Sequence, residues 1–373
     1  MVRSSMMTRR SFINTSALAL AAANLPSQLA WASISTGVTG LKNLVPPSML
    51  IGAVVDRWQI EDSRWRPIIL NNFNLVTLGK LKMSYVRPTP DAFDFRETDW
   101  MVSFCHEKRI AMHGHNLCWN ANNPQWLAQA LNRNNAANIL TDHIHTVMKR
   151  YAGSITSWDV VNEPVAEWMG RSDGLYRGPW LDALGPQYMD IAFHAAAEAD
   201  PKALRVLNIA HVEQGGEGSD KARLMTLRLV EDLLRRGVPV QAIGLESHLN
   251  GNYSVLSTRS RSSFLHNLRQ LGLQILITEL DIDDTQLPSE ITRRDAIVSE
   301  CYAEYLAAIL EEAAPSRVIF FSPGDQRNWY DSVHQAAYVR RDGERHRPGL
   351  FDSALIPKTA YNSVAQTLQS YRT

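Results

Sequence analysis

Eight short apolar segments recur along the chain. They are rich in Val, Ile and Leu and are too short to be independent helices. Continuous rather than alternating hydrophobicity is typical of parallel strands that are buried on both faces. We therefore expect strands at residues 50–55, 75–78, 110–115, 155–162, 204–209, 242–247, 274–280 and 318–322.

Stretches with helical composition lie between these segments, at residues 136–151, 187–199, 220–236 and 294–314. Alternating strands and helices indicate either a closed barrel or a doubly wound sheet. A dinucleotide-binding sheet carries a glycine-rich loop after its first strand, but Gly52 stands alone there, and the glycines of residues 215–218 follow the fifth segment. The sequence therefore predicts an α/β fold, a (β/α)8 TIM barrel, as a single catalytic domain over residues 49–373.

Charge and cysteine content narrow the possible partners. Lys plus Arg and Asp plus Glu both number 38, so the formal net charge is zero, which argues against a nucleic-acid partner. Cys105, Cys118 and Cys301 are too few for a disulfide framework. We expect three buried free thiols, and one bridge with one free thiol is the open alternative.

The first residues have the pattern of an export signal. Arg9 and Arg10 precede an apolar run at residues 16–23, and residues 30–32 read Ala-Trp-Ala, the form of a cleavage site. Paired arginines in this place resemble a twin-arginine signal, and the apolar run is shorter than the ~20 residues that span a bilayer. We expect a signal peptide at 1–32, a lead-in segment at 33–48, and a bacterial protein that is periplasmic or extracellular, monomeric and not stably bound to a membrane.

Chemically active residue types gather at the ends of the predicted strands. In (β/α)8 barrels, the loops at the C-terminal strand ends build the active site. The residues of these types at the strand ends are His113, His115, Asn162, Glu163, Glu246, His248, Glu279, Asp281 and Asp325. Their positions predict one site at the C-terminal mouth of the barrel.

Two carboxylates carry the functional hypothesis. Glu163 and Glu279 each end an apolar strand, where an ionisable group is costly unless it faces an open site. The fourth and seventh strands stand nearly opposite each other at the mouth, so the two carboxylates can face each other across a bound sugar. Glycoside hydrolysis requires such a pair. A lone Glu at a strand end is more often an ion-pair partner, but two in matching contexts favour catalysis.

The segments around these residues resemble a known family. Residues 158–164 and 277–282 resemble the two signature segments of glycoside hydrolase family 10, the retaining endo-1,4-β-xylanases. The resemblance runs from about residue 50 to residue 368 in the order of the family. It implies cleavage of internal β-1,4-xylosidic bonds of xylan by double displacement. Further matching segments are 111–120, 124–127, 244–248, 349–352 and 357–362.

The resemblance also assigns roles to individual residues. It makes Glu163 the acid/base and Glu279 the nucleophile, with Asn162 bound to the sugar hydroxyl next to the reacting carbon. It makes His248 the partner that orients Glu279, with Asp281 behind it. The residues that it places around the sugar being cleaved are His115, Trp119 and Trp329.

The chain departs from the family at the end of the second strand. The family reads Thr-Pro-Glu-Asn-Glu-Met-Lys-Trp there and binds the neighbouring non-reducing xylose with Glu, Asn and Lys, whereas residues 77–84 read Thr-Leu-Gly-Lys-Leu-Lys-Met-Ser. Gly79 replaces Glu, Lys80 replaces Asn, and Met83 replaces Lys, with Lys82 alongside. Compensation by Lys80, Lys82 or Arg87, for an acidic or decorated sugar, is one explanation.

Three further departures lie elsewhere: Asn120 replaces a His, Glu246 replaces the Gln before His248, and Phe321 replaces a Trp. Together the departures leave three hypotheses open. The first and favoured one is a xylanase, the second a retaining β-glycosidase of altered sugar specificity, and the third an inactive carbohydrate-binding barrel.

Two histidine pairs raise the alternative of a metal site. His113 and His115 alternate on a strand, as metal ligands would, but the resemblance places His115 on sugar. His143 and His145 fall in a predicted helix, where a spacing of two residues points them apart. We therefore expect no metal and no other cofactor.

Overall fold

The computed structural model describes residues 39–253, 258–332 and 336–372. The predicted export signal therefore lies outside the described residues, as do residues 33–38 of the predicted lead-in. The unit from Gly40 to Thr373 forms one compact body around a hydrophobic core. Among the described residues, we find no helix with the length and apolarity that a bilayer crossing requires.

Eight parallel strands close into a barrel in the order β1-β2-β3-β4-β5-β6-β8-β9, and β9 returns to β1. The prediction of a single-domain (β/α)8 barrel is confirmed. A short additional strand, β7, extends the sheet at the outer end of β8. The strands are β1 (Leu50–Val54), β2 (Leu75–Leu78), β3 (Ala111–Trp119), β4 (Ser157–Asn162), β5 (Leu204–Ile209), β6 (Ala242–Leu245), β7 (His248–Asn250), β8 (Gln274–Asp283) and β9 (Arg317–Phe320).

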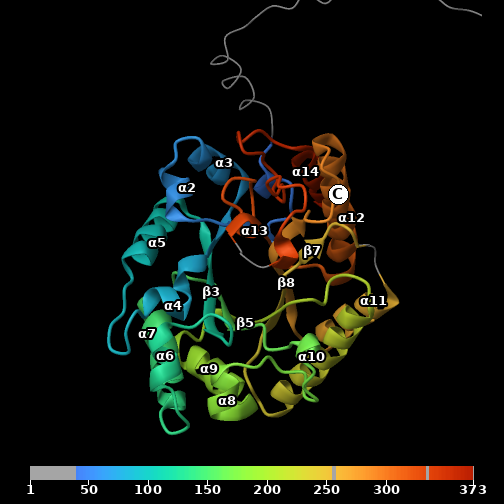
Figure 1. Cartoon of the computed structure of the whole chain (residues 1–373). Helices are drawn as coiled ribbons and strands as arrows, with labels where there is room; N and C mark the ends of the chain where they lie inside the picture. Colours follow the sequence, from blue (N-terminus) through green and yellow to red (C-terminus); the bar gives the residue numbers. More distant parts are fainter. Residues whose placement is uncertain (1–38, 254–257, 333–335, 373) are drawn as a thin grey trace, which may run out of the picture. The chain divides into compact units, whose positions relative to one another are not determined.

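Helices lie around the outside of the strands (Figure 1). The α-helices are α2 (Arg57–Glu61), α3 (Trp65–Asn72), α4 (Met83–Val86), α5 (Arg96–Lys108), α6 (Gln125–Ala130), α7 (Ala136–Arg150), α8 (Pro179–Leu184), α9 (Tyr188–Ala199), α10 (Glu217–Arg235), α11 (Arg259–Gln270), α12 (Ile291–Ala313), α13 (Trp329–Ser332) and α14 (Thr359–Arg372). Short 3-10 helices are η1 (Leu41–Asn43), η2 (Gly79–Leu81), η3 (Glu167–Met169), η4 (Gly185–Gln187) and η5 (Ala336–Tyr338). The four predicted helices all form, with ends shifted by three residues at most.

The sixth predicted strand differs from the sequence expectation. Residues 242–247 were expected to be continuous, but β6 ends at Leu245 and β7 begins at His248. Ser247 has a φ of 63°, a left-handed conformation that ends strand pairing. The amide of Ser247 is instead satisfied by the Glu213 carboxylate at 2.8 Å. The break redirects the chain so that β7 pairs with the outer half of β8.

The three cysteines are buried and free. The expectation of free thiols is therefore confirmed, and the alternative of one bridge is wrong. In the part of the lead-in that the structure describes, Leu41 is fully buried and its amide donates to the Asn72 side chain at 3.2 Å. This contact joins the start of the compact unit to the end of α3.

The interior of the barrel is tightly packed between β3 and β4. Gly114 lies beside Trp158 in the parallel register, and Trp158 is fully buried. A Cβ added at Gly114 would lie 2.2 Å from the indole of Trp158. Glycine is therefore required here because the large ring fills the space that a side chain would need.

We expect Gly114→Ala to lower the free energy of unfolding by about 1–3 kcal/mol or more, since overpacking forces shifts in neighbouring side chains. Denaturant unfolding followed by tryptophan fluorescence measures the change. Gly215→Ala is the matched control, because its Cβ would meet only Thr258 at 3.5 Å. Equal stability of the two variants would contradict this account of the packing.

Candidate active site

Glu163 follows directly after β4 in a strained backbone conformation. Its φ is 48°, a left-handed value that is uncommon for residues with side chains. The Glu163 amide donates to the Asn208 carbonyl at 3.0 Å, and the Asn162 amide group donates to Glu163 Oε1 at 3.3 Å. These two hydrogen bonds hold the strained residue in place at the mouth of the barrel.

The pKa of Glu163 is raised to about 7. Burial is the main cause, because it disfavours the charged form, and the negative charge of Glu279 adds to it. A carboxyl group with such a pKa holds a proton near neutrality and can also release it. This is the behaviour that a general acid and base requires.

Glu279 lies within β8 and is nearly fully buried. Its Oε1 accepts from Asn208 at 2.8 Å, its Oε2 lies 3.2 Å from His248 Nε2, and His115 Nδ1 is 3.7 Å from Oε1. Burial alone opposes its ionisation, but His115 and His248 outweigh this effect and lower the pKa of Glu279. The two carboxyl groups therefore have opposite pKa shifts, which suits one to donate a proton and the other to act as an anion.

Asn208, in β5, connects the two carboxyl groups. Its Oδ1 accepts from the Thr278 hydroxyl at 2.7 Å, which fixes the orientation of the amide. Its Nδ2 then donates to Asn162 Oδ1 and to Glu279 Oε1, both at 2.8 Å. A chain of hydrogen bonds thus runs from Glu163 through Asn162 and Asn208 to Glu279. Asn208 was not among the predicted site residues, although a polar residue inside an apolar strand was a usable signal.

Glu246 is a third buried carboxyl group in this cluster. It follows β6, and its Oε1 lies 3.3 Å from Asn208 Nδ2. That nitrogen carries two hydrogens, which Asn162 and Glu279 already accept at shorter distance. Burial and the charges of Glu163 and Glu279 raise the pKa of Glu246 well above its usual value. Glu246 is therefore a neutral acid at the pH where Glu279 is ionised.

Asp281 is fully buried and accepts hydrogen bonds from several side chains at once. It binds His248 Nδ1 at 2.7 Å, and since Glu279 occupies the other ring nitrogen, both nitrogens of His248 face carboxylates. Burial opposes protonation of His248, but Asp281 and Glu279 outweigh it and raise its pKa well above the usual value. The further donors to Asp281 are Trp329 Nε1 at 2.8 Å, the Tyr330 hydroxyl at 2.8 Å and the Ser322 hydroxyl at 3.3 Å.

Aromatic rings surround His248 at the ends of β7 and β9. The rings of Phe321 and Trp329 lie 4.9 and 5.0 Å from its imidazole, measured between centroids. Both rings are partly exposed. Trp329 was predicted near the sugar and Phe321 was predicted to replace a family Trp, and the structure brings both of them to the same side of the site as His248.

His115 and Trp119 come from β3. His115 Nδ1 bonds to Asp159 Oδ2 at 2.9 Å, and His113 bonds to the same oxygen at 2.9 Å. Trp119 lies beside Asn162 in the β3–β4 register. The Lys82 ammonium lies 5.1 Å from the centre of the Trp119 ring. Lys82 thus brings a positive charge to the site, whereas Met83, the residue aligned with the family lysine, is buried.

Other residues singled out in the sequence lie outside this cluster. Arg87 is buried and pairs with Asp142 at 2.8 Å, so it is part of the packing and not a compensating ligand. Asn120 accepts the amide of Trp180 at 3.2 Å. Lys80 is not in contact with the carboxyl cluster, and its ammonium lies 4.4 Å from the Tyr85 ring centre.

An exposed aromatic group lies on another side of the mouth. Trp168, in η3 after β4, is 50% exposed, and its ring is 4.6 Å from His211 and 6.2 Å from Tyr176. Trp180, in α8, is fully buried, and its Nε1 donates to Asn123 at 3.1 Å.

Among the residues that the structure describes, three clusters have the residue types of metal ligands, with ligand atoms within 4.8 Å of one another. Two of them belong to the carboxyl cluster already described. In the third, Asp284 is bonded to His346 at 2.6 Å and is flanked by Arg294 and Arg340, whose charges disfavour a cation. His143 is buried with its pKa lowered by burial to about 3, whereas His145 pairs with Glu198 at 3.3 Å.

The fold and the paired carboxyl groups define a glycoside hydrolase of the (β/α)8 class. The family model for glycosyl hydrolase family 10 matches residues 40–367. The chain therefore belongs to this family.

Similar proteins are named as xylanases. Endo-1,4-beta-xylanase C of Paenibacillus barcinonensis is 28% identical over 370 residues, which cover 91% of this chain and 33% of that protein. Endo-1,4-beta-xylanase B of Thermotoga neapolitana is 27% identical over 84% of this chain and 86% of that protein. The crystal structure of xylanase 10B from Thermotoga petrophila in complex with xylobiose has a TM-score of 0.79, with 25% identity over 91% of this chain and 99% of that one. The chain thus spans about a third of the length of the Paenibacillus relative.

The charge arrangement makes a prediction for the titration of Glu163. We expect Glu279→Gln to lower the pKa of Glu163 below about 7, because it removes a negative charge that raises this pKa. We expect Glu246→Gln to leave it unchanged, because a neutral acid is replaced by a neutral amide. Carboxyl titration by carbon NMR of glutamate-labelled protein measures both. A clear fall in the pKa of Glu163 in Glu246→Gln would mean that Glu246 is ionised.

Proposed function

We propose that the protein is a retaining endo-1,4-β-xylanase, with Glu163 as the acid/base and Glu279 as the nucleophile. The observation that carries the proposal is the hydrogen-bonded chain from Glu163 through Asn162 and Asn208 to Glu279. It joins a protonated and an ionised carboxyl group at the mouth of a (β/α)8 barrel. Membership of family 10 and the likeness to xylanases support the same activity.

In the first step, the ionised Glu279 attacks the anomeric carbon of the sugar, and the bond to the leaving oxygen breaks. That oxygen takes the proton of Glu163. The product is a glycosyl ester of Glu279 and a free leaving group. His248, which is held by Asp281, faces Glu279 and keeps it ionised before the attack.

In the second step, water attacks the anomeric carbon, gives a proton to Glu163 and releases Glu279. The ester has removed the negative charge of Glu279, one of the causes that raise the pKa of Glu163. The pKa of Glu163 therefore falls when the ester forms, and Glu163 becomes the base that this step needs. Each half of the cycle thus sets the proton state that the next half requires.

The remaining predicted residues have supporting roles in this proposal. Asn162 is placed to bind the hydroxyl next to the reacting carbon, as Asn208 fixes its amide. Glu246, as a neutral acid, occupies the position of an amide without adding charge. The residues proposed to line the cleaved sugar are His115, Trp119, Phe321 and Trp329.

A second candidate is a retaining β-glycosidase with a different sugar preference. The observation that favours it is the segment after β2, where Gly79 and Lys80 stand in place of residues that bind the neighbouring xylose in the family. An inactive carbohydrate-binding barrel is a third candidate, but the opposite pKa shifts of Glu163 and Glu279 argue against it.

The proposed location is outside the cytoplasm. Arg9 and Arg10 before an apolar run, followed by Ala-Trp-Ala at residues 30–32, support export. Sequencing the N-terminus of protein recovered from the periplasm or medium is expected to give a start near Ser33. Retention of the unprocessed chain in the cytoplasm would contradict export.

Incubation with soluble xylan is expected to release a mixture of short xylo-oligosaccharides with the β-anomer formed first. Proton NMR of the fresh products measures both length and anomer. Glu279→Ala should abolish this release, and Glu107→Ala, which removes an exposed carboxyl group on α5, is the control. Activity on aryl β-glycosides with none on xylan would favour the second candidate, and first release of the α-anomer would refute retention.

The assignment of Glu163 predicts a dependence on the leaving group. Glu163→Ala should lower kcat/KM by roughly 10²–10⁴ on xylo-oligosaccharides, whose leaving oxygen needs a proton. It should affect the glycosylation step much less on aryl glycosides with acidic phenols, which leave without one. Pre-steady-state release of the phenol measures that step. An equal loss on both substrates would show that Glu163 is not the acid.

A further inference from the structure

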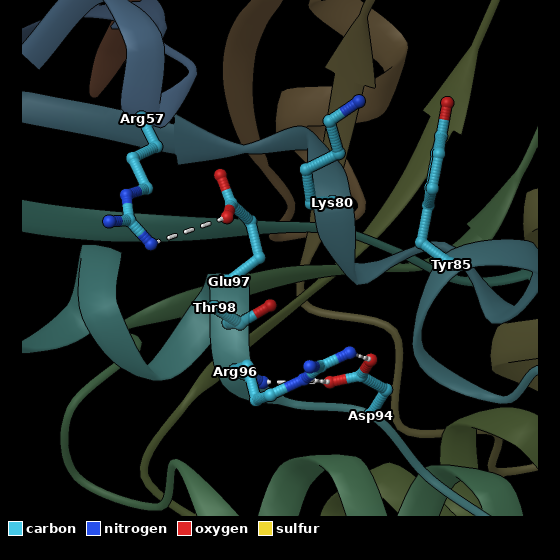
Figure 2. A pocket seen from close by; sticks show the side chains of 7 residues that line it. All are labelled: Arg57, Lys80, Tyr85, Asp94, Arg96, Glu97 and Thr98. Atoms are coloured by element: carbon cyan, nitrogen blue, oxygen red, sulfur yellow. Dashed lines mark hydrogen bonds and ion pairs between the residues drawn. The ribbon is translucent and has the colours of Figure 1, made fainter. Parts of the chain in front are cut away.

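A cavity of about 430 Å³ opens next to the altered segment after β2. Figure 2 shows its lining, in which Lys80 and Tyr85 point in the same direction from neighbouring turns of the chain. The volume falls in the range of roughly 300–1,000 Å³ that is usual for small-molecule sites. The residues that line it are Arg57, Lys80, Tyr85, Asp94, Arg96, Glu97 and Thr98.

Three residues, Trp119, Lys82 and Lys80, link the carboxyl cluster to the cavity. Trp119 is beside Asn162 in the β3–β4 register, and Lys82 lies over Trp119 with 5.1 Å between ammonium and ring centre. Lys80 is two residues before Lys82, in η2, and reaches into the cavity. Lys82 and Lys80 therefore connect Trp119, beside the carboxyl cluster, with the lining of the cavity.

The cations of the cavity differ in their partners. Arg57 pairs with Glu61 at 2.7 Å and approaches Glu97 at 3.9 Å, and Arg96 pairs with Asp94 at 2.6 Å. In the parts of the chain that the structure describes, no carboxylate oxygen lies within 4.0 Å of the Lys80 ammonium. Its contact is the Tyr85 ring, with 4.4 Å between ammonium and ring centre. Lys80 is thus the cation of this lining whose charge is not neutralised.

Gly79 adds a second, steric observation. A Cβ at Gly79 would meet only Val54, at 3.8 Å, and its backbone is not in the left-handed region. Packing therefore does not require glycine here. The absence of a side chain leaves open space beside Lys80, and it also leaves Lys80 without a carboxylate neighbour from position 79.

We propose that this cavity binds a carboxylate-bearing sugar, a uronic acid attached to the glycone side of the polysaccharide, with the Lys80 ammonium as the ion-pair partner. Tyr85, which is 49% exposed, offers its ring to the apolar face of the same sugar. The inference rests on the proposed function, since it names the substrate class of that site. It makes the protein a hydrolase for acidic xylan rather than for the bare backbone.

The test compares two xylo-oligosaccharides of equal backbone length, one with a uronic acid on the glycone side and one without. The measured quantity is the ratio of kcat/KM for the acidic to the neutral substrate. Lys80→Ala should lower this ratio roughly 1.5- to 5-fold, because a partly exposed ion pair contributes modestly. Lys80→Arg should retain most of the ratio. Lys108→Ala is the control. It also removes one positive charge, but from the last residue of α5, whereas the cavity is lined by the first residues of this helix, so the ratio should be unchanged.

Salt provides an independent readout. The wild-type ratio should fall as sodium chloride rises from low to high concentration, because an exposed ion pair is screened. The ratio of Lys80→Ala should be insensitive to salt. A ratio that is the same in wild type and Lys80→Ala, or a loss of activity in Lys80→Ala that is equal for both substrates, would overturn the inference while leaving the xylanase proposal intact.

A binding measurement distinguishes failure of the cavity assignment from failure of the proposed xylanase function. Calorimetry with the acidic oligosaccharide and Glu279→Ala measures recognition without turnover, and the double variant with Lys80→Ala should bind it more weakly by a similar factor. If wild type cleaves neither oligosaccharide but binding depends on Lys80, the proposed function fails and the cavity assignment stands. If binding is also independent of Lys80, the cavity assignment fails.

Discussion

The double pairing of β8 is the constraint on which the site depends. Its first half pairs with β6, which closes the barrel, and its second half pairs with β7. His248 and Asp281 are therefore direct neighbours in register, at the point where β8 leaves the barrel. The left-handed Ser247 makes this geometry possible, because it ends β6 and redirects the chain into β7. A backbone feature thus determines which side chain faces Glu279.

Burial then determines how the charges in the mouth are distributed. Placing several carboxyl groups in a desolvated cluster is costly unless protons or cations compensate. Glu279 and Asp281 have His248 between them, and Asp159 has His113 and His115. In the described part of the chain, no cationic nitrogen lies within 4.0 Å of a carboxyl oxygen of Glu163 or Glu246, and in both the pKa is raised. Desolvation therefore has two outcomes in this cluster: Glu279 in β8 is ionised because cations lie beside it, and Glu163 after β4 keeps its proton.

The sequence predicted the barrel and its strands well, because uniform hydrophobicity over short segments is a local property. It also predicted that Glu163 follows the end of its strand, but the expectation that Glu279 ends its strand was wrong, because β8 continues to Asp283. It did not predict Asn208, whose importance comes from contacts with side chains of β4 and β8 that only the folded barrel provides. Nor did it decide between Lys82 and Met83, since which side chain faces the mouth depends on the local turn of η2 and α4.

Two of the departures from the family pattern, Glu246 and Lys80, differ in their electrostatic effect. Glu246 stands in place of a neutral amide, and with its raised pKa it adds a hydrogen-bonding group without adding a charge to the cluster. Lys80 also stands in place of a neutral residue, but it adds a charge that the described residues do not neutralise. The first change therefore leaves the electrostatics of cleavage as they are. The second is the change on which the proposed uronic-acid site rests, so under this proposal the chain differs from its family in recognition more than in chemistry.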